Sequence, residues 1–199
     1  MVRPQQITDA QITDAARAVF LEHGPGASVR LVARRLGVSH AAVLQRAGSK
    51  TALLRRALRP GAPEVAEALA RGPDPDRPID EQLIEHLLSA HDFLQQLVPS
   101  LVVLRAAGHD FEHEERVAPP IHLRRLLAAW LTKARRAGAP RMGRPVALAE
   151  ALLGALEARC FNGYIGGSSF VSGSPQRFVR SLVAALVSGP PSIPEGSNP

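Results

Sequence analysis

The sequence predicts an all-α protein in which an N-terminal three-helix helix-turn-helix domain is followed by a larger helical domain. Three observations predict this fold class. Apolar residues recur at helical spacing along most of the chain, and no convincing run alternates between apolar and polar residues as a strand would. Gly and Pro clusters separate the periodic segments. Near the N-terminus, two short helical segments meet at one glycine, Gly37.

The first predicted helix covers residues 8–23. Its apolar face comprises Ile12, Ala15, Ala16, Val19 and Phe20, at the spacing of successive helical turns. Gly24-Pro25-Gly26 then stops the helix.

Residues 28–36 and 39–47 are predicted to form the next two helices, with Ser28 and Ser39 as their N-caps. Gly37 can supply the left-handed turn between them, because glycine adopts that conformation without a steric penalty. A helix-turn-helix also needs a small residue near the crossing, and Ala33 stands four residues before Gly37. The alternative is a chance αα-hairpin with no binding role.

The rest of the chain is also predicted to be helical. Ser49 can cap a fourth helix, which Pro60-Gly61-Ala62-Pro63 interrupts. In segment 80–98 an apolar face that includes His91 lies opposite a polar face that includes Gln82, and Pro99 is expected to end this helix. Further helices are predicted at 64–71, 100–107, 121–137, 145–162 and 176–188. We expect domains at 1–59 and 60–188, and a disordered tail at 189–199.

Composition and charge narrow the class of protein. The chain has 45% hydrophobic residues, no apolar run long enough to span a membrane and no signal-peptide pattern, which favours a soluble cytoplasmic protein. A single cysteine excludes an internal disulfide framework. Residues 1–59 hold ten Lys or Arg against three acidic residues, a charge of +7, whereas the whole chain carries +6. The excess predicts an anionic partner for the N-terminal end.

A helix-turn-helix places the start of its second helix in the major groove of DNA. The residues predicted to face base edges are Ser39, His40, Ala41, Ala42, Leu44 and Gln45. Gln45 can pair with adenine through two hydrogen bonds, and alanine can contact the thymine methyl group. The residues better placed for phosphates are Ser28, Arg30, Arg46 and Lys50.

The order of these parts resembles a known family. The stretch "ITDAARAVFLEHG" leads into "SVRLVARRLGVSHAAVLQRAGSKTALLRRAL", and residues 8–58 are similar to the N-terminal domain of TetR-family bacterial transcriptional regulators. The resemblance implies a homodimer that binds an operator and releases it when a small-molecule effector enters the C-terminal domain. The family usually has tyrosine where this chain has Leu44 and a His-Phe pair where it has Arg46-Ala47. It usually has no proline where this chain has Pro60.

The resemblance also implies roles for the second domain. The last two long helices are expected to pair with those of a second copy through Leu148, Leu152, Leu156, Phe178, Val179, Leu182, Val183 and Leu186. The side chains that could line an effector cavity are His91, Phe93, Phe111, Trp130, Phe161 and Tyr164. Each of these has a plainer alternative as an ordinary core residue. Cys160 is most simply a buried small hydrophobic residue.

Two other functions remain open at this stage. His109 and His113 are four residues apart, as in a metallohydrolase helix, but Asp110 stands where the glutamate base would be. The chain also fits a helical interaction module that has lost specific DNA binding, since the usual aromatic residues are replaced by Leu44 and Ala47. The DNA-binding regulator is favoured over both, with no catalytic residue, no metal site and no cofactor expected.

Overall fold

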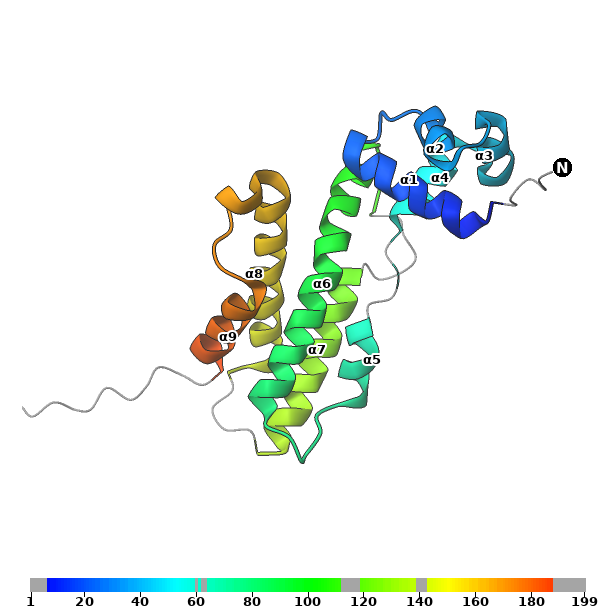
Figure 1. Cartoon of the computed structure of the whole chain (residues 1–199). Coiled ribbons are helices and arrows are strands. Elements are labelled where there is room, and N and C mark those ends of the chain that lie inside the picture. The colour runs from blue at the N-terminus through cyan, green and yellow to red at the C-terminus, as the bar shows by residue number, and fades with distance from the viewer. Residues whose placement is uncertain (1–6, 60, 62–63, 112–118, 139–142, 188–199) are drawn as a thin grey trace, which may run out of the picture. The chain divides into compact units, whose positions relative to one another are not determined.

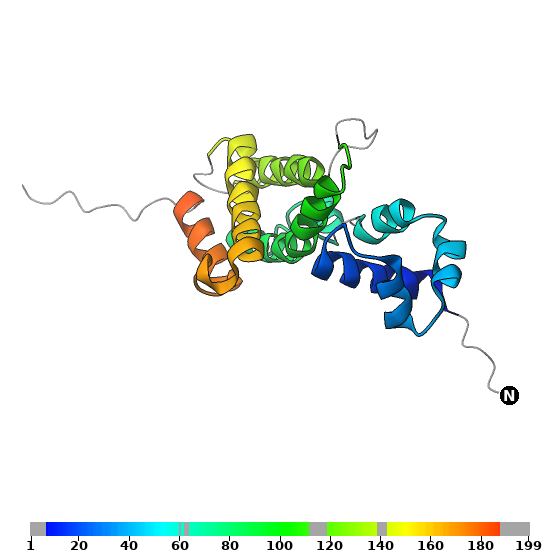
Figure 2. The ribbon, with the colours of Figure 1, turned by 90° about the horizontal axis from the view of Figure 1, so that it is seen from above.

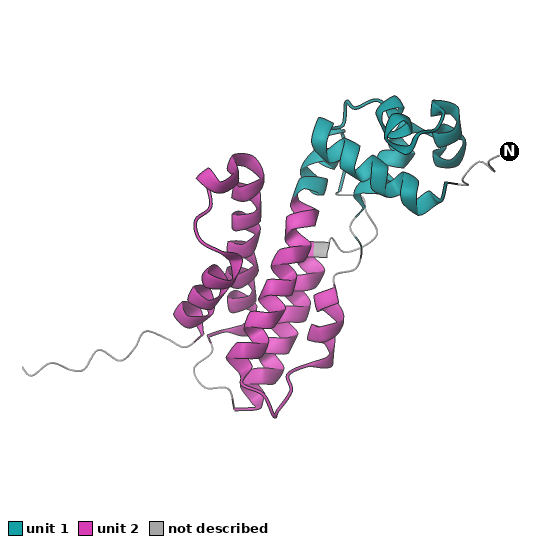
Figure 3. Cartoon of the chain, viewed as in Figure 1, with its two compact units in different colours: residues 1–61, 99–113 teal, residues 62–98, 114–199 magenta. Residues whose placement is uncertain are grey.

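The computed structural model describes residues 7–59, 61, 64–111, 119–138 and 143–187, and these residues form helices and connecting loops without a strand. The all-α prediction is therefore confirmed. The chain divides into two compact units, shown in teal and magenta in Figure 3: residues 1–61 with 99–113, and residues 62–98 with 114–199. The predicted tail, 189–199, lies outside the described residues.

The first unit contains four short helices (Figure 1): α1 (Asp9–His23), α2 (Val29–Leu36), α3 (His40–Ala47) and α4 (Lys50–Leu58). Each begins after a hydroxyl N-cap whose side chain accepts a backbone N–H, and these caps are Thr8, Ser28, Ser39 and Ser49. Gly37 ends α2 with φ 69° and ψ 28°, the left-handed conformation. The predicted caps and turn are thus confirmed.

The core of the first unit is assembled from all four helices and from a distant segment. Phe20, Val43 and Leu53 are fully buried, and α1 contacts both α2 and α4. Val103 and Leu104, from the end of a later helix, belong to the same buried cluster. These contacts hold α2 and α3 in the helix-turn-helix arrangement and leave their outer faces exposed.

The second unit is built around long helices. It contains α5 (Glu64–Arg71), most of α6 (Ile79–Ala106), α7 (Pro119–Arg136), α8 (Pro145–Gly166), the 3-10 helix η1 (Gly167–Ser169) and α9 (Pro175–Leu186). Helix α8 packs against α7 on one side and α9 on the other (Figures 1 and 2). The largest buried side chain here is Trp130, whose ring meets the edge of the His86 ring with 5.2 Å between centroids.

The expectation that Pro99 ends its helix is wrong, because α6 continues through it to Ala106. An internal proline removes a backbone hydrogen bond and costs about 3 kcal/mol. Leu94 and Leu97 before it, and Val103 and Leu104 after it, are all buried. Each such burial contributes about 1.5–3 kcal/mol, which together outweigh the proline penalty. By length and composition α6 could also span a membrane, but its buried residues are those of a core helix.

Gln82 also differs from the prediction, which placed it on the polar face. Its side chain is buried, and its amide fastens the loop before α6. Gln82 Oε1 accepts the Asp74 backbone N–H at 2.8 Å, and Nε2 donates to the Asp74 and Arg77 carbonyls at 2.9 Å. All three hydrogen bonds go to backbone groups of the loop, so the buried amide is fully paired although it lies inside.

The connection between α8 and α9 is held down by Arg159. Its guanidinium donates to the carbonyl oxygens of Ser172 at 3.0 Å and Gly173 at 2.6 Å. The same group lies over the Phe178 ring, 4.9 Å from its centroid, in a cation–π contact. The loop is therefore tied to both helices that it joins.

Candidate DNA-binding surface

Helix α3 presents most of its circumference to solvent. Only Val43 and Ala47 are buried, and Leu44 is half-buried. The remaining predicted base-contact residues are exposed: Ser39, His40, Ala41, Ala42 and Gln45. An exposed helix supported by its neighbours through one narrow face can enter the major groove of DNA.

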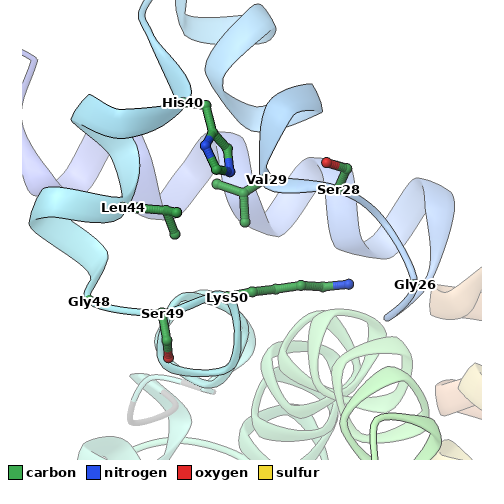
Figure 4. A pocket seen from close by; sticks show the side chains of 8 residues that line it. All are labelled: Gly26, Ser28, Val29, His40, Leu44, Gly48, Ser49 and Lys50. Atoms are coloured by element: carbon green, nitrogen blue, oxygen red, sulfur yellow. The ribbon is translucent and has the colours of Figure 1, made fainter.

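A hollow of about 550 Å³ lies between α3 and the N-terminal ends of α2 and α4 (Figure 4). Val29 and Leu44 give it an apolar floor, and the side chain of Lys50 extends along it (Figure 4). The complete lining is Gly26, Ser28, Val29, His40, Leu44, Gly48, Ser49 and Lys50. The structure therefore gathers Ser28, His40, Leu44 and Lys50, which the sequence analysis had singled out, in one place.

The hollow suits an anion. Two helix N-termini open beside it, and each carries a partial positive charge from its unpaired backbone N–H groups. Lys50 adds a full positive charge, and within the part of the chain that the structure describes no carboxylate pairs with it. A phosphate group placed here would meet backbone amides, hydroxyls and an ammonium.

Two predicted arginines lie outside the hollow. Arg30 is exposed on the first turn of α2, where its backbone N–H donates to Ser28 Oγ at 3.2 Å. Arg46 lies on the other flank of α3 and pairs with Asp9 at the start of α1, with 3.3 Å between Nη1 and Oδ1. The structure thus separates Arg46 from the other predicted phosphate contacts.

Comparisons with known proteins identify this arrangement. Residues 12–57 match the sequence model described as "Bacterial regulatory proteins, tetR family". This match covers most of α1, all of α2 and α3 and most of α4, and it includes the hollow and the exposed helix. The helix-turn-helix unit is a DNA-binding domain of the TetR family of bacterial transcriptional regulators.

Solved structures have a similar fold over most of the chain. A structure titled "Molecular basis for control of antibiotic production by a bacterial hormones" is 25% identical, with a TM-score of 0.62 over 89% of this chain and 96% of that chain. A TetR-like regulator from Rhodococcus sp. RHA1 is 23% identical, with a TM-score of 0.60 over 94% and 100%. A TetR regulator from Pseudomonas syringae pv. tomato is 22% identical, with a TM-score of 0.59 over 92% and 97%. No curated protein sequence matches.

The TetR assignment also settles the enzyme alternative, since regulators of this family are non-enzymatic DNA-binding proteins. His113 lies outside the described residues. The His109 ring instead meets the edge of the Phe111 ring, with 4.7 Å between centroids. Among the described residues, no three His, Cys, Asp or Glu side chains gather as metal ligands.

The six side chains proposed to line an effector cavity differ in how far they are buried. His91 and Trp130 are buried in the second unit, and Phe93 is half-buried there. Phe111 packs against the core of the first unit, and its place in an effector cavity stays a prediction. Phe161 and Tyr164 are exposed on α8, at 44% and 40% of their surface, because they lie on the face that points away from the core.

The proposed dimer residues divide into two groups. Leu148, Leu152, Leu156, Val179 and Val183 are buried within their own chain, so they form its core rather than an open surface. Phe178 and Leu182 are half-buried, and Leu186 is exposed. Exposed apolar residues that were not predicted from the sequence lie on the outer face of α8 and in the following loop: Val146, Ile165 and Phe170. Their signal was a second apolar row on α8, opposite the core-facing row.

Cys160 is a core residue, as expected. Burial raises the pKa of its thiol to about 11, which keeps it protonated and poorly reactive at neutral pH. Its Sγ lies 3.8 Å from the His91 carbonyl oxygen, to which the thiol donates a weak hydrogen bond between α8 and α6.

Proposed function

We propose that this protein is a repressor that binds a palindromic DNA operator as a homodimer and is released by a small-molecule effector in the bacterial cytoplasm. The observation that carries the DNA-binding part is the exposed face of α3 beside a hollow formed by two helix N-termini and Lys50. In this proposal Ser28, Arg30 and Lys50 contact phosphates. Gln45 and His40 read base edges, and Ala41 and Ala42 approach thymine methyl groups.

The proposed dimer uses the outer faces of α8 and α9. Val146, Ile165 and Phe170 expose 66%, 59% and 62% of their surfaces, which is unusual for large apolar side chains. Leu186 adds an exposed apolar group on α9. A second copy placed on this face by a two-fold axis would cover these groups on both chains. The two copies of α3 would then read inverted half-sites, which makes the operator palindromic.

The proposed effector site lies in the second unit, among α6, α7 and α8. Trp130 Nε1 is buried, and within the described residues it donates to no acceptor. A small molecule with a carbonyl or hydroxyl oxygen could accept this hydrogen bond and remove the penalty of an unpaired buried donor. The 25% identical structure, whose title concerns bacterial hormones, supports a small organic effector.

The experiment that tests DNA binding is selection of bound sequences from a random duplex library by the full-length protein, followed by a salt titration of the best binder. We expect a palindromic sequence. Gln45→Ala should relax the base preference at one base pair in each half-site. The free energy of operator binding should become less favourable by about 1–3 kcal/mol. Lys50→Gln should weaken binding to all DNA sequences by a similar factor. It should also reduce the slope of log K against log salt concentration by about one.

The alternative functions give different results. No enrichment at 50 mM salt, with the protein shown to be folded and effector-free, would contradict DNA binding and favour the helical interaction module. Unchanged base preference in Gln45→Ala would remove Gln45 from the base-reading residues while leaving the DNA-binding function intact.

A further inference from the structure

The start of α1 places a carboxylate beside the recognition helix α3. Asp9 is the first residue of α1, and its Oδ1 lies 3.3 Å from Nη1 of Arg46. The two residues are far apart in sequence, so the contact depends on the packed first unit. Of the acidic residues in α1, Asp9 is the one that reaches α3; Glu22 instead lies 3.8 Å from Arg35 of α2.

Asp9 is held in position by the backbone around it. Thr8 and Gln11 form a reciprocal capping box, in which Gln11 Oε1 accepts the Thr8 N–H at 2.8 Å and Thr8 Oγ1 accepts the Gln11 N–H at 3.2 Å. Thr13 Oγ1 donates to the Asp9 carbonyl oxygen at 2.8 Å. Asp9 therefore offers a fixed negative charge to its neighbour.

Arg46 is directed toward this charge by the orientation of α3. Val43 and Ala47 face the core, which leaves Arg46 on the flank next to α1, while His40 and Leu44 line the hollow on the other flank. Lys50 lies on that other side and has no carboxylate partner among the described residues. Two cations near one recognition helix thus have different electrostatic environments.

We propose that Asp9 withholds Arg46 from the DNA phosphates, so that Arg46 adds nothing to the salt-dependent part of operator binding. This inference rests on the proposed DNA-binding function. A cation strengthens DNA binding mainly because it replaces counterions condensed on phosphates. Arg46 already has a counterion in the form of Asp9, and the pair approaches DNA with no net charge. Asp9 is accordingly a residue that sets affinity without touching DNA.

A double-mutant cycle on the full-length protein, with its selected operator and with random duplex DNA, tests the proposal. Asp9→Asn frees Arg46 while keeping the size of the side chain. For this variant, the slope of log K against log salt concentration should become steeper by about 0.9. Its affinity for both DNAs should increase by the same factor. That change in slope corresponds to a roughly threefold to fourfold difference between 50 and 200 mM salt.

The remaining variants complete the cycle. Arg46→Gln should leave the wild-type slope unchanged, and Asp9→Asn/Arg46→Gln should return to it. Asp14→Asn is the matched control, because Asp14 is an exposed carboxylate on the same helix. Circular dichroism melting verifies that each variant is folded.

Three results would overturn the inference. The first is an Arg46→Gln slope reduced by about 0.9, which would make Arg46 a phosphate contact. The second is weaker DNA binding by Asp9→Asn, which would mean that the Asp9–Arg46 pair holds α3 in its DNA-binding orientation. The third is a slope that steepens in Asp14→Asn as much as in Asp9→Asn. The effect would then come from the net charge of the protein and not from the pairing with Arg46. Failure of the wild-type protein to bind any duplex would instead reject the proposed function itself.

Discussion

Gly166 is the residue at which α8 gives way to the loop before α9, and an aromatic ring occupies the space beside it. A Cβ atom added to Gly166 would lie 2.1 Å from Cγ of Phe170. Rotation of the ring about its Cβ–Cγ bond leaves Cγ in place, so it cannot relieve this clash. Phe170 would have to adopt another χ1 rotamer, or the backbone of η1 would have to move against the hydrogen bonds of Arg159 to the residues that follow it.

Gly166→Ala is therefore expected to lower the free energy of unfolding by about 1–2 kcal/mol, as overpacking does. Urea unfolding followed by circular dichroism measures this. Gly163→Ala is the control, because its added Cβ would lie 3.8 Å from Val171 Cγ2, an ordinary contact. Phe170→Ala introduced together with Gly166→Ala should recover most of the loss. A Gly166→Ala protein as stable as the wild type would show that the ring moves freely.

Helix α9 has two apolar rows with different surroundings. Val179, Val183 and Val187 are buried in their own chain. In the neighbouring row Phe178 and Leu182 are half-buried, and Leu186 exposes 40% of its surface. The second row is therefore the part of α9 that is available to another molecule.

Leu186→Glu should convert the proposed dimer to a monomer, because an unpaired carboxylate in an apolar interface costs about 3 kcal/mol or more. The dimer dissociation constant should rise at least about a hundredfold, as measured by analytical ultracentrifugation. Ile121→Glu serves as the comparison, since Ile121 is an exposed apolar residue on α7, at 46%. If both variants dimerise like the wild type, the α9 row is not part of the interface.

The elements show which features were predictable from the sequence. The caps at Ser28 and Ser39 and the turn at Gly37 were predictable because each depends on neighbours within a few residues. The continuation of α6 through Pro99 was not, since it depends on what its leucines and valines are packed against. Local pattern decides the ends of a helix, whereas tertiary burial decides whether an unfavourable residue is tolerated inside it.

The candidate sites also contain features that were predictable from the sequence and features that were not. The hollow at α3 includes Ser28, His40, Leu44 and Lys50 because the helix-turn-helix fixes its own geometry over about 50 residues. The pairing of Arg46 with Asp9 joins two helices and leaves no trace in local sequence spacing. Periodicity also identified both apolar rows of α9, but it could not tell which row a neighbouring helix covers.

At the scale of the whole molecule, acid should destabilise the fold through two histidines of α6. Burial lowers the pKa of His86 and of His91, so each ring takes up a proton more readily in the unfolded chain. Their contribution to stability is complete above the unfolded pKa, about 6.5, and is lost as the pH falls below it toward the lowered folded pKa. Glu157, whose pKa is raised by desolvation, acts in the opposite direction at lower pH.

The pH prediction is tested by urea midpoints measured between pH 8 and pH 5. The wild-type midpoint should fall over this range, and the fall should be smaller in His91→Gln and in His86→Gln. His122→Gln, at an exposed histidine on α7, should keep the full dependence. Equal slopes in all four proteins would place the acid sensitivity elsewhere.

The first unit is discontinuous along the chain, and this affects how it is made. Its core needs Val103 and Leu104, yet its own four helices end at Leu58. A ribosome must therefore add the 46 residues from 59 to 104 before the buried cluster can close. The first unit can thus reach its native packing only after the end of α6 has been synthesised. A gene fusion that carries residues 1–59 alone would therefore lack part of the buried cluster of the first unit.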